Sequence, residues 1–304
     1  MSSYELFPRY FFMRSSRRKR APELVKTSGV SLDEFPISGT VVPNHPEFPE
    51  HWHRFVEIGI VVGGSGVHVL NEQELPIMAG HVFVLPPGFK HAYRKPVGLS
   101  LINICYDPER LCFDGAELDD LPGYDALFHI EPRLRSSGNL EHVLRLEPRE
   151  LCRIEALALR IVHESRKRPK GFRLMSRARL LQLITELSRL YDGPRMAPSA
   201  LAHRLASVIK YLESHIREEI DFDELPGKFH FSKRSFYRFF TSVTGQSPLA
   251  YLRTCRLKEA SRLLQETDKL VSEIAFDVGF QDSSHFSHRF QEMFGLTPSD
   301  FRNQ

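Results

Sequence analysis

The stretch that decides the fold of the C-terminal third is IAFDVGFQDSSHFS, residues 274–287. Ile274 and the small Ala275 open a short helix that a following helix can cross closely. Gly279 can adopt the left-handed backbone conformation that ends this helix. Asp282 or Ser283 then supplies the side-chain oxygen that caps the next helix. Two short helices separated by a tight turn are typical of a helix-turn-helix unit.

The second helix of this unit has one predicted apolar stripe and one predicted polar face. Phe286, Phe290 and Met293 recur at helical spacing, so we expect them to be buried. The other positions are left to face outward. They are Ser283, Ser284, His285 and His288.

The same pattern occurs about fifty residues earlier in the chain. Internal repetition of this kind indicates two copies of one structural unit. In the earlier copy the predicted cap is Ser232, and the predicted stripe is Phe236, Phe239, Phe240 and Val243. The matched positions are Phe236, Phe240, Gly245, Ser247, Pro248 and Tyr251 in the first copy and Phe286, Phe290, Gly295, Thr297, Pro298 and Phe301 in the second.

The outward positions of the first copy carry long donors that can meet phosphates and base edges in a major groove. A helical bundle with a duplicated packing pattern and a solvated polar face would show the same repeat. Net charge does not separate the two interpretations, because residues 201–304 carry 14 Lys/Arg and 14 Asp/Glu. Any positive surface must therefore come from the placement of charges. The outward positions are Lys233, Arg234, Tyr237 and Arg238.

Residues 201–304 resemble the DNA-binding domain of the AraC/XylS family, most closely in segments 248–260 and 274–287. The resemblance implies two helix-turn-helix units joined by a central helix, binding to double-stranded DNA, activation of transcription and contact with RNA polymerase. It places the DNA-contacting surface on two groups of side chains. These are Arg234, Tyr237 and Arg238 in the first unit and Ser283, Ser284, His285 and His288 in the second.

One departure from the family pattern lies at Leu225-Pro226-Gly227, where the first unit usually opens its short helix with Leu-Ala. Proline is tolerated only in the first turn of a helix, and glycine weakens a helix by about 1 kcal/mol relative to alanine. We therefore expect the first short helix to be displaced or partly irregular.

The N-terminal half has a different periodicity. Residues 35–106 alternate apolar and polar side chains and are broken by Gly and Pro, which predicts a small antiparallel β-barrel or sandwich. Gly63–Gly66 is predicted to be a tight turn between two strands, Asn71-Glu72 a second turn, and segments 80–85 and 99–106 further strands. After Pro148, helical spacing predicts two amphipathic helices, which either cover the barrel or form a dimer contact.

These patterns predict a two-domain α+β protein. We assign residues 1–34 to an N-terminal tail, 35–193 to a cupin-like ligand-sensing domain that also dimerises, 194–200 to a linker and 201–304 to the all-α DNA-binding domain. The four cysteines are scattered, which predicts reduced thiols. Neither an apolar run of membrane-spanning length nor a secretory signal occurs, so we expect a cytoplasmic protein with no membrane partner.

One cluster of the N-terminal domain, His51, His53, Glu57 and His91, has the spacing of the two cupin motifs. In metal-dependent cupins such positions bind a divalent ion, for which imidazole and carboxylate ligands suit Zn, Fe, Mn or Ni. His45 and Lys95 stand where the motifs carry Gly and Asn. Three interpretations remain open: a metal site, a pocket that hydrogen-bonds a sugar, and structurally satisfied histidines.

The sugar pocket is favoured, with no cofactor expected, because a domain joined to a DNA-binding unit needs a signal. The sensor half also resembles that of the rhamnose-operon activators, which implies a deoxyhexose such as rhamnose. The predicted function is a ligand-responsive transcription activator, and the alternative is a metal-dependent cupin isomerase or dioxygenase that also regulates. The segments that carry this resemblance are residues 64–71, 103–111 and 121–128.

Overall fold

The computed structural model describes residues 32–111, 113, 118, 120–139, 143–193 and 199–303. The chain forms two compact units, residues 1–203 and 204–304. The tail predicted at 1–34 and the linker predicted at 194–200 lie mostly outside the described residues. Over the part of the chain that is described, no helix combines the length and the apolar character that a membrane span requires.

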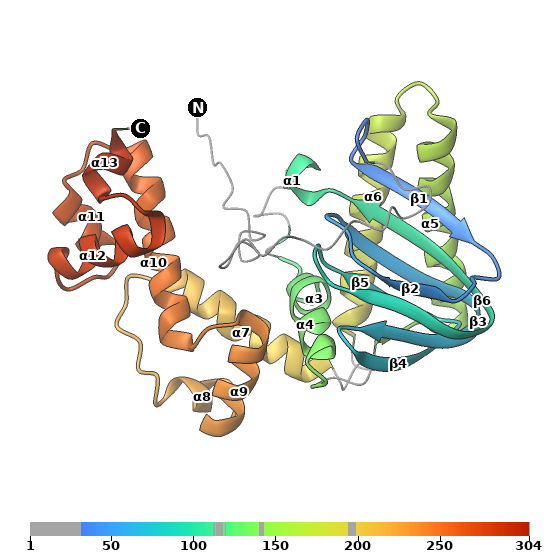
Figure 1. Cartoon of the computed structure of the whole chain (residues 1–304), viewed down its shortest axis with the longest axis horizontal. Helices are drawn as coiled ribbons and strands as arrows, with labels where there is room; N and C mark the ends of the chain where they lie inside the picture. Colours follow the sequence, from blue (N-terminus) through green and yellow to red (C-terminus); the bar gives the residue numbers. More distant parts are fainter. Residues whose placement is uncertain are drawn as a thin grey trace. The chain divides into compact units, whose positions relative to one another are not determined.

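The first unit is built on an antiparallel sheet (Figure 1). Its strand order is β1-β6-β3-β5-β7, with β2 paired to β6 and β4 paired to β3. The strands are β1 (Ile37–Val42), β2 (Phe48–His51), β3 (Val56–Leu70), β4 (Gln73–Met78), β5 (His81–Leu85), β6 (His91–Tyr106) and β7 (Leu144–Arg145).

The predicted barrel is not closed, because β1 and β7 end the strand order and do not pair with each other among the described residues. Two long strands, β3 and β6, pair along both of their halves. The first half of β3 also pairs with β5 and the second half with β4. The sheet thus changes its outer strands along its length and is not closed among the described residues.

The predicted turn at Gly63–Gly66 was wrong, because β3 runs through these residues without reversing. The register between β3 and β6 shifts three times between Val61 and Val67, as it does at β-bulges. Gly64 has a φ of +68°, and a Cβ there would lie 2.2 Å from the carbonyl oxygen of Gly98. The glycines therefore bend two paired strands together. The turn predicted at Asn71-Glu72 is confirmed, with φ values of 46° and 70° that suit a two-residue hairpin loop.

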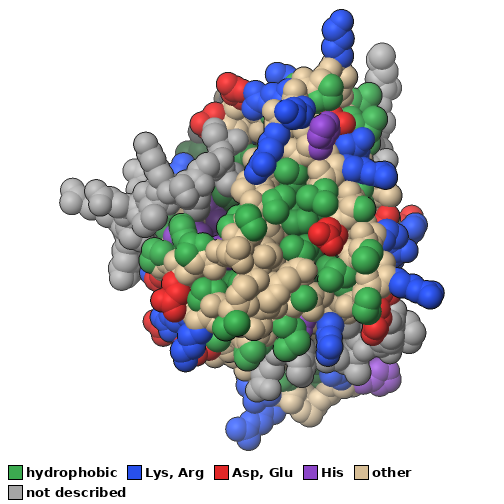
Figure 2. All heavy atoms as spheres, turned by 90° about the vertical axis from the view of Figure 1, so that its right-hand side faces the viewer, with side chains coloured by type: hydrophobic (Ala, Val, Ile, Leu, Met, Phe, Trp, Pro, Cys, Tyr) green, Lys and Arg blue, Asp and Glu red, His purple; other side chains and the backbone are tan. Residues whose placement is uncertain are grey.

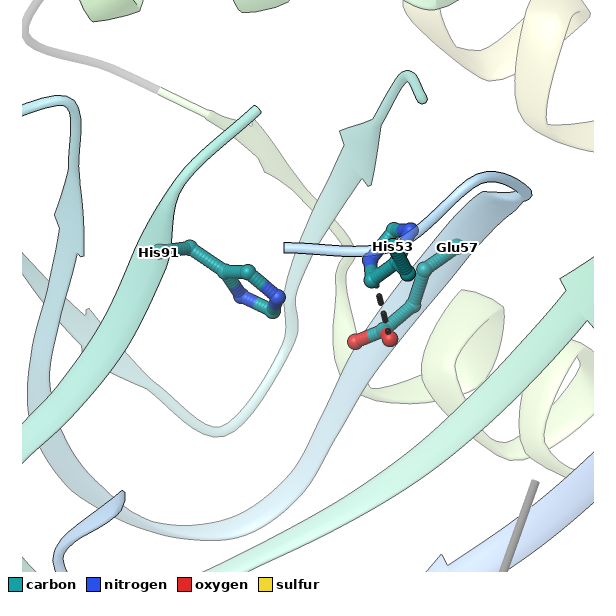
Figure 3. A group of neighbouring side chains, drawn as sticks. All are labelled: His53, Glu57 and His91. Atoms are coloured by element: carbon teal, nitrogen blue, oxygen red, sulfur yellow. Dashed lines mark ion pairs between the residues drawn. The ribbon is translucent and has the colours of Figure 1, made fainter. Parts of the chain in front are cut away.

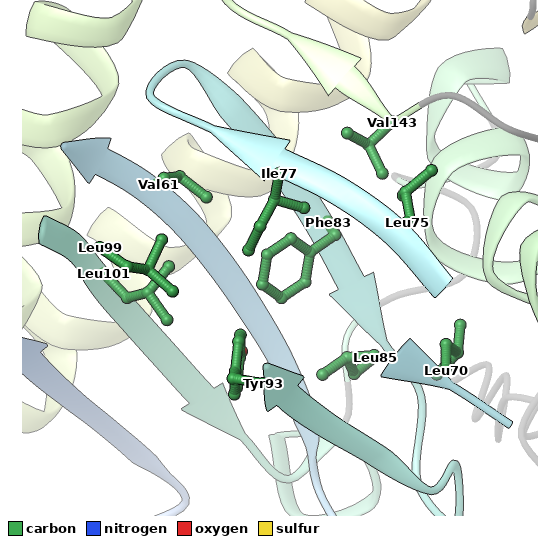
Figure 4. Packing of buried hydrophobic residues seen from close by; sticks show 10 residues of the cluster. All are labelled: Val61, Leu70, Leu75, Ile77, Phe83, Leu85, Tyr93, Leu99, Leu101 and Val143. Carbon is green, nitrogen blue, oxygen red and sulfur yellow. The ribbon is translucent and has the colours of Figure 1, made fainter. Parts of the chain in front are cut away.

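The core of the sheet joins side chains from strands on either side of this bend (Figure 4). Phe83 from β5 and Tyr93 from β6 have ring centroids 6.3 Å apart. Burial of such a set is the main source of the domain's stability. The cluster consists of Val61, Leu70, Leu75, Ile77, Phe83, Leu85, Tyr93, Leu99, Leu101 and Val143.

The helices of the first unit confirm the predicted change of period after Pro148. On α5 (Pro148–Lys167), Ile154, Leu157, Ala158 and Ile161 are buried, and the helix packs so closely on β1 that a Cβ at Gly39 would lie 2.8 Å from Val162. The helix α6 (Phe172–Tyr191) packs beside it. The other described helices are α1 (Pro108–Leu111), α3 (Pro122–Tyr124), the π-helix η2 (Asp125–Ile130) and α4 (Glu131–Ser136).

The surface of the molecule is mixed in character. On the face shown in Figure 2, hydrophobic side chains gather toward the middle, whereas Lys and Arg side chains project mostly around the edge. Both long helices of the first unit also expose apolar side chains, which are Leu159 on α5 and Leu174 and Met175 on α6.

The second unit is helical, as predicted. The last helix of each repeat begins at a proline whose preceding hydroxyl residue is the cap: Ser247 accepts from the backbone N–H of Ala250, and Thr297 accepts from that of Asp300. The helices are α7 (Ser199–Ser214), α8 (Leu225–Lys228), α9 (Lys233–Thr244), α10 (Pro248–Glu266), α11 (Val271–Asp277), α12 (Ser283–Phe294) and α13 (Pro298–Arg302).

The two helix-turn-helix units differ in their first helices, as the Pro226-Gly227 pair predicted. The helix α8 has four residues, whereas its counterpart α11 has seven. The turn after α11 uses Gly279 with a φ of +90°, and a Cβ there would lie 2.6 Å from the carbonyl oxygen of Ile216. The small Ala275 is fully buried in the core of the second helix-turn-helix unit.

The predicted apolar stripes are largely confirmed. Phe236, Phe240 and Val243 are buried on α9, and Phe286 and Phe290 are buried on α12. Met293 was a wrong prediction, because its side chain is 37% exposed. Phe294 packs in its place, with its ring centroid 4.5 Å from that of Phe290 and 5.3 Å from that of Phe301.

Candidate functional site

The four polar residues that the sequence grouped in the first domain come from neighbouring strands. His51 ends β2 and pairs in register with His91 at the start of β6. His53 follows β2, and Glu57 lies near the start of β3. All four are buried, with exposed fractions between 1% and 6%. Strand pairing therefore brings residues 40 positions apart in the chain, His51 and His91, side by side.

Three of these side chains, His53, Glu57 and His91, converge (Figure 3). One potential ligand atom from each lies within 4.8 Å of those from the other two. The Nε2 atom of His53 is 3.5 Å from Oε2 of Glu57. The Nδ1 atom of His53 is 2.8 Å from the carbonyl oxygen of Phe55. Because only a protonated nitrogen can donate to a carbonyl, this contact leaves Nε2 as the acceptor in the neutral ring.

Burial controls the protonation of this group. It lowers the pKa of His53 to about 4 and holds the pKa of His91 well below its ordinary value. It raises the pKa of Glu57 to about 7. Desolvation disfavours the charged form in each case. Near neutral pH the two imidazoles are therefore uncharged and offer lone pairs to a ligand.

His51 lies beside this group but is not one of the three converging side chains. Its ring centroid is 4.0 Å from that of His91. Its Nδ1 atom is 3.0 Å from the carbonyl oxygen of Pro49. Burial lowers the pKa of His51, although hydrogen bonds to the backbone of Pro49 and His91 oppose that effect. His51 thus lies against His91 and outside the group of three.

His68 on β3 also belongs to the site, and sequence reasoning missed it. It is fully buried, and its Nε2 atom is 3.5 Å from Nδ1 of His91. Its ring stacks on Phe83 with centroids 4.4 Å apart. The signal in the sequence was a single histidine in the otherwise apolar segment 67–70.

The site holds several buried polar atoms that have no hydrogen-bond partner among the described residues. They include Nε2 of His53, Nε2 of His91, Oε1 of Glu57, Nδ1 of His68 and the hydroxyl of Tyr93. Leaving such a group unsatisfied costs about 1–3 kcal/mol. Because buried polar groups are nearly always paired, this concentration of free atoms indicates a place where a polar ligand or an ion binds.

The predicted DNA-binding residues of the first helix-turn-helix unit form an exposed basic face on α9. Ser232 caps the helix by accepting from the backbone N–H of Ser235 at 3.3 Å. Lys233 and Arg238 are exposed, and Tyr237 is half-buried. Lys233 forms an ion pair with Asp223 at 2.6 Å, whereas the Arg238 guanidinium lies over the ring of Phe239 at 4.4 Å. The remaining member of the face, Arg234, is exposed.

The corresponding face on α12 is closer to neutral. Oδ1 of Asp282 accepts from the backbone N–H groups of Ser284 at 2.6 Å and His285 at 2.9 Å, which resolves the choice of cap between Asp282 and Ser283. Nδ1 of His288 lies 3.4 Å from a carboxylate oxygen of Glu292. The predicted residues Ser284, His285 and His288 are exposed and Ser283 is half-buried.

Sequence reasoning also missed Arg289, the one Lys or Arg on α12. Its Nε donates to Nε2 of His285 at 3.3 Å, and its Nη1 pairs with Glu292 at 2.8 Å. This pairing offsets much of the positive charge on α12.

Comparisons with known proteins find a matching family for each of the two domains. Residues 43–184 match the family of AraC-like ligand binding domains, and residues 227–304 match a helix-turn-helix domain family. The chain is 31% identical over 280 residues to the HTH-type transcriptional activator RhaS of Escherichia fergusonii, covering 90% of this chain and 95% of that relative. The chain belongs to the AraC family of transcriptional regulators. The resemblance drawn from its C-terminal motifs is thereby confirmed.

Two further proteins are similar to this chain in part or in most of their length. The HTH-type transcriptional activator RhaR of Mannheimia succiniciproducens is 31% identical over 274 residues, which is 90% of this chain and 93% of that relative. Among solved structures, the DNA-binding domain of AdpA in complex with a target DNA is 34% identical and covers 33% of this chain and 90% of its own, with a TM-score of 0.32.

Proposed function

We propose that this AraC-family protein is a cytoplasmic transcription activator whose DNA binding responds to a sugar, such as rhamnose, held by its first domain. The observation that carries the proposal is the buried group of unpaired polar atoms around His53, Glu57 and His91, in a domain joined to two capped recognition helices. The group supplies the acceptors and donors that sugar hydroxyls need. The relatives named as activators at 31% identity support the regulatory part.

Double-stranded DNA is the partner of the second domain in this proposal. The helix α9 would use Lys233, Arg234, Tyr237 and Arg238, and the helix α12 would use Ser283, Ser284, His285 and His288. We expect the two helices to enter successive major grooves on one face of the duplex, which lie about 34 Å apart. Of the two, α9 has three cations and no acid, so it carries most of the attraction to phosphate.

The remaining partners follow from the same proposal. A homodimer would form through the exposed apolar side chains of α5 and α6, namely Leu159, Leu174 and Met175. The bound activator would contact RNA polymerase. No reaction is assigned to the first domain, since the relatives that cover 90% of this chain are named as activators.

Selection of duplexes from a random-sequence pool tests the DNA-binding part with the full chain. We expect one sequence class to be enriched, and we expect Arg238→Ala to weaken binding to it by about 5- to 150-fold, the effect of losing 1–3 kcal/mol. The matched control is Arg166→Ala, which removes an exposed arginine of α5. Unchanged affinity in the Arg238 variant would contradict the assignment of α9 as a recognition helix.

Calorimetric titration with a panel of sugars tests the effector part. We expect one sugar to bind at millimolar concentration or below and to change the affinity for the selected duplex. The variant His53→Ala should lose sugar binding while it still binds DNA. If no sugar of the panel binds, the proposal of a sugar effector is contradicted, whereas the proposal of a DNA-binding regulator is not affected.

A further inference from the structure

We infer that His53, Glu57 and His91 bind a divalent transition-metal ion through two imidazole nitrogens and one carboxylate, and that His51 is not one of its ligands. This deepens the proposed effector site and rests on it only for the role of the ion in sensing. The sequence alone favoured direct hydrogen bonding between these residues and a sugar. The geometry favours a metal ion between them, because three ligand-type atoms from three buried side chains point at one place (Figure 3).

The ligand atoms follow from the hydrogen bonds of the two histidines. His53 uses Nδ1 to donate to the carbonyl oxygen of Phe55 at 2.8 Å, so its lone pair is on Nε2. His91 has its Nδ1 3.5 Å from Nε2 of His68, and its own Nε2 has no partner among the described residues. Metal-binding histidines usually have such a partner on the nitrogen that does not bind the metal, because it fixes the ring orientation. Phe55 and His68 supply these outer contacts.

The spacing of the group is close to that of an occupied site. The three ligand atoms lie within 4.8 Å of one another. Bonds of about 2.0–2.2 Å to a common ion place two ligand atoms at most about 4.4 Å apart. Small rotations of the side chains therefore suffice to bring all three into a single coordination sphere.

The neighbours of the group limit the set to three ligands. His51 does not belong to the group whose ligand-type atoms lie within 4.8 Å of one another, and its ring is tilted by 41° against that of His91. Sγ of Cys105 is 3.9 Å from Oε2 of Glu57, where it donates to the carboxylate. Both residues thus support ligands and do not compete with them.

A set of two imidazoles and one carboxylate suits Zn, Fe, Co or Ni and leaves coordination positions free. When bound, the ion supplies a Lewis acid that accepts oxygen atoms of a ligand at those positions. Hydroxyl groups of the effector are the natural occupants, so the ion would link the protein side chains to the sugar.

A cobalt titration of the full-length, untagged protein tests the inference. The protein is first dialysed against a chelator and then titrated with Co²⁺, and the visible absorption of the ion reports its coordination. Trp52, the single tryptophan of the chain, lies between His51 and His53 and gives a second signal through quenching of its fluorescence. Zn²⁺ is then added to displace the cobalt.

The variants separate ligands from neighbours. His53→Ala removes an imidazole, and Glu57→Gln keeps the shape of the side chain but removes the carboxylate, with circular dichroism to show that each is folded. His51→Ala tests the exclusion of that residue, and His163→Ala, at an exposed position of α5, is the matched control.

We expect one Co²⁺ per chain in the wild type, in His163→Ala and in His51→Ala. We expect binding at least about 100-fold weaker in folded His53→Ala or Glu57→Gln, which exceeds the usual effect of losing an outer contact. Lack of saturable binding in the wild type would overturn the site, and undiminished binding in Glu57→Gln would overturn the ligand set. An equally large loss in His51→Ala would overturn the exclusion of His51. None of these outcomes alters the duplex selection, so failure here is distinguishable from failure of the proposed function.

Discussion

The Nε atom of Arg135 lies 3.2 Å from Oε1 of Glu131, and the two side chains are only 2% and 1% exposed. Both residues belong to α4, and the Nη2 atom of Arg135 also donates to the carbonyl oxygen of Val84 in β5 at 2.9 Å. The guanidinium carbon lies 5.8 Å from the centre of the Phe83 ring. This buried ion pair therefore attaches the helix α4 to the sheet of the first domain.

Breaking this ion pair should destabilise the first domain. We expect Arg135→Met to lower the free energy of unfolding by about 3–5 kcal/mol, because it leaves the buried Glu131 without a counter-charge. The double variant Glu131→Leu/Arg135→Met should recover most of this loss, since it buries no charge at all. Urea denaturation of the wild type and the two variants measures both effects. A double variant as unstable as the single one would show that packing dominates over charge at this position.

The cap of α12 predicts a loss of stability in acid. The backbone N–H groups of His285 and Ser284 bond to the Asp282 carboxylate and lower its pKa below the ordinary 3.8. A lowered pKa means that the folded state binds the proton less well, so the stabilisation is complete above about pH 4 and is lost as the pH falls through the folded pKa. Asp282→Asn keeps a capping oxygen that does not titrate. We expect its melting temperature to fall less steeply than that of the wild type between about pH 4 and pH 2.

The helix-turn-helix repeat was predictable because its signals are local. Caps, the left-handed glycine and an apolar stripe act within a few residues, and Ser232, Asp282 and Gly279 have the predicted roles in the structure. Met293 was misplaced because the partner that decides burial there, Phe301, comes from another helix and packs on Phe290 and Phe294.

The sheet of the first domain was less predictable, because pairing between strands that are distant in the chain overrides the local conformational preference of the sequence. Gly63–Gly66 has the composition of a turn, yet pairing with β6 keeps β3 continuous through it. The candidate site shows the same limit. Spacing indicated His51, His53, Glu57 and His91, but only the pairing of β2, β3 and β6 brings His51 beside His91 and His68 into contact with it.

Two glycines of the helix-turn-helix units, Gly227 and Gly279, should respond to alanine in opposite directions. Gly227 lies in α8, and a Cβ there would have no atom within 4 Å. We expect Gly227→Ala to raise the free energy of unfolding by about 0.5–1 kcal/mol, because alanine loses less backbone entropy on folding. Gly279→Ala should lower it by more than about 1 kcal/mol, since its φ is +90° and the new Cβ would lie 2.6 Å from the carbonyl oxygen of Ile216. Thermal unfolding by circular dichroism compares the two.

The last prediction concerns α9 and α12, where the repeat places Arg238 and His288 at equivalent positions fifty residues apart. Arg238 is an exposed cation, whereas His288 is a histidine with Nδ1 3.4 Å from an oxygen of Glu292. A cation that neutralises a phosphate releases about one counterion from DNA, so removing it reduces the slope of log affinity against log salt by about 1.

We therefore expect Arg238→Ala to reduce the salt slope for the selected duplex by about 1, and His288→Ala to leave that slope unchanged, because the Glu292 carboxylate beside His288 offsets positive charge there. His288→Ala should instead weaken the preference for the selected sequence over a scrambled one, because contacts to base edges carry the sequence information. Fluorescence anisotropy at a series of salt concentrations, with both duplexes, measures the two effects. Equal slopes for both variants would contradict the division of roles between an α9 that anchors on phosphates and an α12 that reads bases.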